Sequence, residues 1–491
     1  MALARIKSIE HLRYCAPGEW GKLLGLDRIP EARTLREKVK YLSQNSQVEA
    51  WGAELCNSWM QASQEFFTAY VDGHVRVYNG SQTKLPKHYV TREKLCLRAT
   101  VDYWVNAMDG QPFFYINKAV DPGLINVMEH EIVPRIEQEL APIDPDKLIA
   151  NPLVHKFTLI FDREGYSPDL MKRMKARRIA CITYNKFPKE NWLNEEFTIH
   201  TVKTVAGNKM EVLLAERGVL LSNNLWIREI RRLNINGHQT SILSTDYSSN
   251  LNVIAAEISD RWNQENYFKY MRENYNLDKL VEYSTEEIDD TTVVVNPEHR
   301  RLDGEVRKLA ATHSRRLAEF GAIHLEGNLE PNEVDAYEKK KAQLQEELNE
   351  LYANLQIKKA DRKQVGRHIK ISELPEEDRF RKLATTAKSF LDTIKMIAYR
   401  AETANVNVMR ETMAKTNEAR SLLRAVYQTE ADLIPNHSNQ TLTIRLHHLA
   451  NHASDQIMRH LCDEINATET TFPGTNMRLI YEIGSNLKST G

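Results

Sequence analysis

Three acidic residues occupy positions where a carboxylate is unusual. Asp72 interrupts a strand-like segment, "FFTAYVDGHVRVY", and is followed by Gly73, where the backbone can turn freely. Asp162 comes directly after "FTLIF", an apolar run with the length of a buried strand. Glu265 belongs to a long helical segment that begins near residue 250. If the strands of the two aspartates are neighbours, both acids reach one rim of a sheet, and a helix packed across that rim can present the glutamate there.

Converging carboxylates repel one another unless cations lie between them. Mg²⁺ suits such a site, because it is a hard ion that takes a few carboxylates together with substrate phosphate, and Mn²⁺ accepts the same ligands. Two ions about 3.5–4 Å apart would hold the attacking and leaving oxygens of a phosphoryl displacement. We therefore predict that Asp72, Asp162 and Glu265 are catalytic metal ligands for DNA strand chemistry. Each acid also has an ordinary explanation: a turn, a helix cap and an ion pair on a solvated helix.

Cations accompany the third acid along its helix. Ile258, Arg261, Glu265 and Arg272 recur at steps of three, four and seven residues, so they share one face. Arg261 and Arg272 are therefore expected to contact phosphates beside the reacting bond, and Lys269 of the same helix is expected to contact DNA with them. The alternative is that Arg261 and Glu265 form an ordinary ion pair between residues four apart.

Five segments around these residues predict a mixed sheet. "FFTAYVDGHVRVY", "LCLRATVDYWVNA" and "PFFYINKA" have the composition of strands, and Asp109-Gly110 predicts a hairpin turn between the last two. "HKFTLIFD" and "IACITYN" predict two more strands, separated by a helix that opens with Ser167 and Pro168. A meander followed by parallel crossovers gives an α/β fold, with helices on both faces of the sheet. We interpret the β-rich stretch at about 195–245 as an insertion before the final helix.

Four segments are predicted along the chain. Residues 1–60 form a helical segment, and residues 61–285 hold the sheet, the insertion and the three acids. Residues 286–430 are helical and charged, and apolar residues at heptad-like steps predict a helical hairpin or a short coiled coil. Residues 431–491 predict a small strand–helix–strand unit, which is the α+β end of the chain.

Composition limits the class of protein. The 491 residues are 42% hydrophobic, and no apolar run reaches the roughly 18 residues that cross a bilayer. Arg5 and Lys7 precede any hydrophobic segment, which argues against a secretory signal. The five cysteines are scattered singly, as in a reducing compartment. We therefore expect a cytoplasmic protein without a membrane partner.

The net charge of −1 provides no global attraction for nucleic acid, but two segments are locally basic. Between Ser167 and Lys189, seven Lys and Arg residues accompany one acid. Between Ile357 and Lys370, six accompany one acid. Such runs suit phosphate contacts, although a solvated helix face is the simpler explanation of either run alone.

The motifs resemble those of DDE transposases. Asp-Arg-Glu-Gly-Tyr at 162–166 resembles their second signature segment, Arg-x-x-x-Glu in "RWNQENYFKYM" the third, and "YVDGHVRVYNG" stands at the place of the first acid. The resemblance is to the bacterial cut-and-paste insertion-sequence type and covers residues 66–285. It implies an RNase H-like catalytic domain with a β insertion, and two Mg²⁺ or Mn²⁺ ions. It further implies double-stranded transposon ends and target as partners, a homodimer assembled on DNA, and a cytoplasmic, nucleoid-associated location in bacteria.

The resemblance also assigns residues that contact DNA. Trp226 lies in the β insertion, where related enzymes stack an aromatic ring on a flipped base, although a tryptophan on an amphipathic strand is more often a core residue. Arg163, beside the second acid, is assigned to DNA as well. The family's helix motif runs Tyr, Arg, Glu, Lys, whereas this chain has Ile258 at the tyrosine position and Arg272 at the lysine position.

Two alternatives stay open. One is a catalytically inactive or truncated transposase-derived DNA-binding protein, since no convincing helix-turn-helix for reading transposon ends is evident. The other is a structure-selective nuclease, which hydrolyses strands without joining them. Three carboxylates too far apart to share ions would favour the inactive protein.

Overall fold

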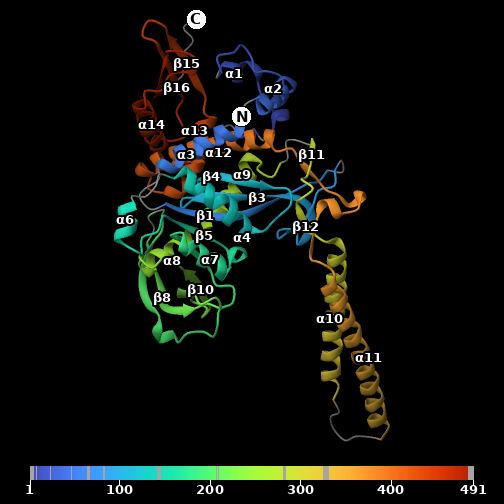
Figure 1. Ribbon diagram of the computed structural model, residues 1–491. Coiled ribbons are helices and arrows are strands. Elements are labelled where there is room, and N and C mark those ends of the chain that lie inside the picture. The colour runs from blue at the N-terminus through green and yellow to red at the C-terminus, as the bar shows by residue number, and fades with distance from the viewer. Residues whose placement is uncertain are drawn as a thin grey trace. The chain divides into compact units, whose positions relative to one another are not determined.

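The computed structural model describes residues 5–6, 8–22, 24–45, 47–62, 67–80, 83–140, 145–205, 207, 209–279, 284–324 and 331–484. The chain divides into two compact units. The first, here called the sheet unit, comprises Met1–Tyr78, Lys87–Ser284 and Ala384–Gly491. The second, here called the hairpin unit, comprises Asn79–Pro86 and Thr285–Leu383 (Figure 1). The division into four domains that the sequence analysis gives, at residues 1–60, 61–285, 286–430 and 431–491, stays a prediction.

A ten-stranded mixed sheet forms the centre of the sheet unit. β1 is antiparallel to β3 and parallel to β5, and β5 is parallel to β6. This confirms the predicted meander followed by parallel crossovers, to which the structure adds the short strand β2. The strand order is β2 (Lys87–Val90), β3 (Leu95–Ala107), β1 (Phe67–Val77), β5 (Phe157–Phe161), β6 (Ile179–Tyr184), β10 (Gln239–Ser244), β9 (Trp226–Leu233), β8 (Lys209–Leu220) and β7 (Thr198–Lys203), and β4 (Pro112–Lys118) also pairs with β3.

The β-rich stretch extends this sheet. β10 pairs antiparallel with β6, with Ile242 opposite Tyr184, and β9, β8 and β7 follow in order. The inserted strands therefore continue the central sheet beyond its expected last strand. This pairing covers the backbone edge that β6 would otherwise expose.

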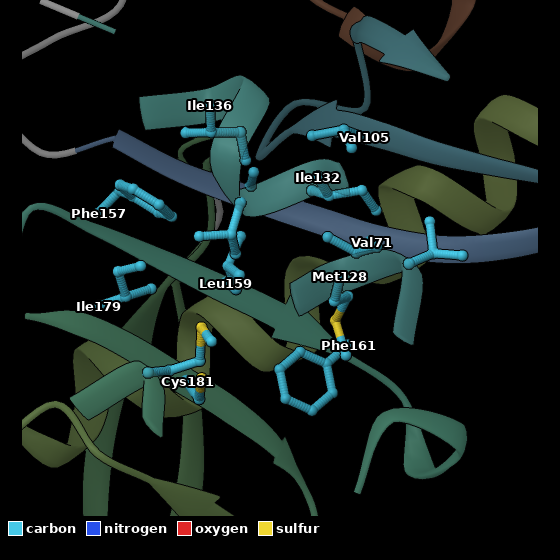
Figure 2. Packing of buried hydrophobic residues seen from close by; sticks show 14 of the residues in the cluster. Val71, Val105, Met128, Ile132, Ile136, Phe157, Leu159, Phe161, Ile179 and Cys181 are labelled. Atoms are coloured by element: carbon cyan, nitrogen blue, oxygen red, sulfur yellow. The ribbon is translucent and has the colours of Figure 1, made fainter. Parts of the chain in front are cut away.

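Alternation along the central strands divides the core into two faces. Leu159 and Phe161 of β5 pack on one face, against the helical segment that follows β4 (Figure 2). Ile160 of β5 and Tyr70 of β1 point to the other face, where they pack against α8 (Leu251–Asp260). Odd and even positions of one strand thus belong to different cores.

The segment after β4 contains a wide turn. α4 (Leu124–Val127) continues into a π-helical turn, Met128–Ile132, and then into α5 (Val133–Glu139). The π-helical turn ends two residues before Pro134, which has no backbone N–H to donate. Figure 2 shows Met128 and Ile132 directed at the strands.

Several further helices belong to the sheet unit. α12 packs on the sheet, because its Tyr399 shares a buried cluster with Trp104 of β3 and Tyr267 of α9. The helices are α1 (Pro17–Lys22), α2 (Ala32–Asn45), α3 (Val48–Gln61), α6 (Pro145–Ala150), α7 (Pro168–Ala176), α9 (Trp262–Tyr275), α12 (Thr386–Thr412), α13 (Ala419–Gln428) and α14 (His452–Ala467).

A small second sheet lies near the carboxyl end of the sheet unit. β16 (Thr441–Leu446) and β17 (Arg478–Ile483) are parallel and joined through α14, which matches the predicted strand–helix–strand unit. An additional strand, β15 (Ala431–Asn436), pairs antiparallel with β16. It contains Pro435, which suits an edge strand but weakens the strand pattern in the sequence.

Two long helices form the hairpin unit. α10 (Pro297–Ala322) and α11 (Pro331–Gln364) are antiparallel, since Arg362 Nη1 lies 2.6 Å from Asp303 Oδ1 and Lys341 Nζ donates to the Phe320 carbonyl. This agrees with the predicted helical hairpin. Two short ladders accompany it, namely β12 (Val293–Val295) with β13 (His368–Lys370), and β11 (Thr285–Glu287) with β14 (Arg381–Leu383). Across the described residues, no helix is both long enough and apolar enough to cross a membrane.

Candidate active site

Two of the three predicted acids lie side by side. β1 and β5 pair in parallel as far as Val71 and Phe161, and the next residues are Asp72 and Asp162. Val71 and Phe161 belong to the core cluster against the helices after β4, so the two aspartates point to the opposite face. That face is the one covered by α8.

Asp72 lies within a strand. Its backbone pairs with Trp104 of β3, and β1 continues to Val77, so the turn considered at Asp72-Gly73 is absent. The Gly73 N–H donates to Asp72 Oδ1 at 2.8 Å. The acid is therefore held where β5 has ended and β1 continues alone beside β3.

Asp162 begins a short turn at the end of β5. Its Oδ1 accepts the Glu164 N–H at 2.8 Å and caps a 3-10 turn, Arg163–Gly165. A Cβ at Gly165 would lie 2.4 Å from Phe161 Cδ2, so only a glycine allows this turn to fold back over the strand.

The helix that follows this turn has a cap of its own. Ser167 Oγ accepts the Leu170 N–H at 3.2 Å at the start of α7. The capping explanation of Asp162 thus holds for the 3-10 turn and not for α7.

Buried amides anchor the start of α9 to the sheet. Gln264 is fully buried, and its Nε2 donates to Asn106 Oδ1 at 2.9 Å and to the Trp104 carbonyl at 3.3 Å. Asn263 Nδ2 donates to the Met108 carbonyl at 2.8 Å. These bonds fix the first turn of α9, and with it Glu265, over the β3–β4 end of the sheet.

Arg261 links the first and third acids. The predicted long helix is interrupted at this residue, which separates α8 from α9. Its Nη2 forms an ion pair with Glu265 Oε1, and its Nη1 lies 3.9 Å from Asp72 Oδ2. The ordinary ion pair with Glu265 is therefore present, but the guanidinium also reaches the strand acid. Glu265 and Asp72 are thus both paired with the Arg261 guanidinium.

Electrostatics mark the site as crowded with negative charge. Burial, followed by the charge of Asp162, raises the pKa of Asp72 to about 7. Burial and then Asp162 also raise the pKa of Glu164. Burial alone would lower the pKa of Arg261, but the charges of Asp72 and Glu265 outweigh it and raise that pKa. One arginine does not neutralise the acids around it.

Two acids near the site were not predicted from the sequence. Glu164 could have been found, because it belongs to the same motif as Asp162. Asp121 follows β4, where it accepts from the Tyr103 hydroxyl and, at 2.8 Å, from the Gly123 N–H. Its charge contributes to the raised pKa of Glu164, and no local pattern in the sequence distinguishes it.

The fit of a metal ion depends on donors and geometry. In the part of the chain that the structure describes, no group of three or more His, Cys, Asp and Glu side chains is arranged to hold a metal ion. The donor set nevertheless suits a hard cation, because carboxylate oxygens gather where burial disfavours their charge. Arg261 provides the positive charge between Asp72 and Glu265.

A cleft of about 380 Å³ lies beside Glu265. Lys269 and Arg272 of α9 line it together with this acid, and Arg92 and Trp262 also line it. The structure thus gathers two predicted DNA-contacting cations and Glu265 in one cleft.

Comparison with known proteins places the chain in a family. A family model described as "Transposase protein" matches residues 1–485. The chain belongs to this transposase family. No curated protein matches the sequence.

The structure also shows the surroundings of the remaining predicted residues of this transposase. Trp226 is 50% exposed and stacks on Tyr247, with ring centroids 5.5 Å apart. Lys175 Nζ lies 4.5 Å from the centre of the Tyr247 ring. Arg163 is exposed in the turn directly after Asp162. Ile258 is buried against the sheet, so the residue at the family's tyrosine position packs in the core.

Proposed function

We propose that this transposase is of the DDE type, from a bacterial insertion sequence, with Asp72, Asp162 and Glu265 as ligands of two Mg²⁺ or Mn²⁺ ions. One observation carries the proposal: Asp72 and Asp162 follow the last paired residues of two parallel strands and face the side from which Arg261 connects Glu265. The strand order β4–β3–β1–β5–β6 supports an RNase H-like domain, because an antiparallel meander precedes two parallel crossovers.

Divalent cations would supply the charge that polarises an attacking oxygen and neutralises a leaving one. The three carboxylates would hold them, which requires Asp72 to be ionised. Arg261 Nε is buried and lacks a hydrogen-bond partner among the described residues. This unsatisfied donor fits a role in binding a phosphate oxygen, so Arg261 would serve the acids before DNA binds and the DNA afterwards.

DNA is the proposed substrate, as double-stranded transposon ends and target. Lys269 and Arg272 would contact phosphates from the cleft beside Glu265, and Arg163 would do so from the turn after Asp162. The exposed ring of Trp226 suits stacking on an unpaired base. The reaction would be cleavage and transfer of insertion-sequence ends by a homodimer assembled on DNA, in the bacterial cytoplasm at the nucleoid.

The test compares two glutamates on one helix. Glu265→Gln should lower Mg²⁺-dependent nicking by more than about a hundredfold, because it removes a proposed metal ligand. Glu273→Gln, an exposed residue of α9, is the matched control. The substrate is genomic DNA that flanks the gene and contains its inverted repeats. Equal nicking by the two variants would remove the catalytic assignment.

One observation favours a second function. Glu265 is paired with Arg261, and the described acids are not arranged around a cation position. A transposase-derived DNA-binding protein without catalysis would keep this arrangement on DNA.

A structure-selective nuclease is distinguished by a substrate with a pre-cut 3′-hydroxyl end. A transposase joins this end to target DNA, whereas a nuclease does not.

A further inference from the structure

Charge is distributed unevenly along the helical hairpin. Its base, residues 296–308 and 357–370, contains ten Lys and Arg residues and four Asp and Glu residues. The remaining described part, residues 309–322 and 331–356, contains five Lys and Arg residues and seven Asp and Glu residues. A hairpin stabilised only by ion pairs on solvated faces would not require this separation, so the base needs its own explanation.

Internal ion pairs use part of this positive charge. Asp303 binds Arg362 at 2.6 Å and Arg307 at 2.8 Å, so one carboxylate faces two guanidinium groups. Glu305 pairs with Arg301 and, at 3.1 Å, with Lys358. These two acidic residues of the base are thus paired with Lys and Arg residues, both within α10 and between α10 and α11.

Other cations of the base have no such partner. Arg300, Lys359, Lys363 and Arg367 are exposed and, among the described residues, make no ion pair. We call these four residues the hairpin patch. Their charges are therefore available to a ligand in solvent.

Backbone geometry brings the patch residues together. Lys359 and Lys363 are four residues apart on α11 and share a face, at a separation of about 6 Å along the helix. Lys363 follows Arg362, whose contact with Asp303 brings α11 against the part of α10 that begins beside Arg300. The Asn296 N–H donates to the Arg367 carbonyl at 3.0 Å, which places Arg367 at the start of α10.

This arrangement suits a regular row of phosphates. Successive phosphates on one DNA strand advance by about 3.4 Å along the axis, so two lysines one helical turn apart match about two nucleotide steps. Long flexible cations without fixed partners favour contacts to the backbone over contacts to particular bases.

We propose that the hairpin patch binds the phosphate backbone of duplex DNA without regard to sequence, as a contact surface additional to the acid site. It rests on the proposed function in taking DNA as the ligand, but it does not require cleavage. Its residues belong to the hairpin unit, whereas all residues proposed for catalysis belong to the sheet unit. The two proposals can therefore fail separately.

The experiment compares two double variants of the full chain. Lys359→Gln/Lys363→Gln removes two patch charges, and Lys339→Gln/Lys340→Gln removes two exposed charges from the other end of α11. Anisotropy measures binding to an arbitrary duplex of about 30 base pairs over a series of salt concentrations. The patch variant should bind about tenfold more weakly at about 0.1 M salt, and its slope of log affinity against log salt should fall by about two. The control should change by less than about twofold.

Equal effects of the two variants, or no effect of either, would overturn the inference. Light scattering of the patch variant measures its oligomeric state. A changed oligomeric state with unchanged DNA affinity would identify the hairpin patch as a protein interface and would also overturn the inference. Glu265→Gln, assayed in parallel, tests catalysis alone. A normal nicking rate in that variant with weakened binding by the patch variant would refute the proposed catalytic site and leave this inference standing.

Discussion

Asp72 on β1 lies beside Asp162 at the end of β5, one position beyond the last paired residues of two parallel strands. Burial and the neighbouring charge raise the pKa of Asp72 to about 7, far above the value of about 4 for a solvated aspartate. The folded chain therefore holds a proton on Asp72 between about pH 4 and 7, where the unfolded chain has lost it.

This difference predicts a pH-dependent effect of Asp72→Asn. Because only the folded chain binds this proton, the contribution of Asp72 to the free energy of unfolding falls as the pH rises from about 4 to about 7. This contribution is lowest above about pH 7. Asp72→Asn should therefore raise the melting temperature more at pH 8 than at pH 5. Thermal denaturation at both pH values measures this difference, and an equal shift at both would contradict the raised pKa of Asp72.

Divalent cations should stabilise the folded chain through the same acids. Because a cation binds the ionised form of Asp72, Mn²⁺ should raise the melting temperature more at pH 8 than at pH 6. The increase should be lost in Asp72→Asn and in Asp162→Asn, and kept in Glu273→Gln. A gain that survives both aspartate substitutions would show that the ion binds elsewhere.

Arg261 should contribute to stability when no divalent cation is bound. Arg261→Gln removes the positive charge between Asp72 and Glu265, and it should lower the free energy of unfolding by about 1–3 kcal/mol. Urea denaturation measures this, with Arg272→Gln as a control that removes an α9 cation without an ion pair among the described residues. Mn²⁺ should recover part of the loss, since it supplies the missing charge. Equal losses in the two variants would indicate no special role for Arg261.

Two glycines should respond in opposite directions to alanine. A Cβ at Gly165 would meet the buried ring of Phe161 at 2.4 Å, so Gly165→Ala should lower the free energy of unfolding by about 1–3 kcal/mol. Gly304 lies within α10 with no atom within 4 Å of the added Cβ, so Gly304→Ala should stabilise by about 0.5–1 kcal/mol. Chemical denaturation distinguishes them, and a neutral Gly165→Ala would mean that the turn after Asp162 tolerates a shift.

Apolar and aromatic runs in the sequence account for much of the central sheet. All five residues of β5 and the first five of β1 are buried, as expected of strands covered on both faces. A parallel crossover between these strands places Asp72 near Asp162. Glu265 was harder to place, because its position depends on Gln264. A glutamine on a polar helix gives no sign that it will be fully buried against β3.

The position of α12 could not be derived from local pattern. Arg76 of β1 is fully buried, and its Nη2 lies 2.8 Å from Asp392 of α12. Lys388 of α12 lies 3.1 Å from the buried Asp102 of β3. Charged residues on an amphipathic helix ordinarily face solvent, so the sequence indicates a helix here but not its burial against this sheet.

The proposed catalysis requires Asp72, Asp162 and Glu265 to bind divalent cations jointly. The most direct measurement is the anomalous scattering of Mn²⁺ in crystals of the chain bound to a DNA end. We expect manganese peaks contacted by carboxylate oxygens of Asp72, Asp162 and Glu265, with Arg261 released from Glu265. Crystals that contain Mn²⁺ and DNA but show no manganese at these acids, with Glu265 still paired to Arg261, would contradict it.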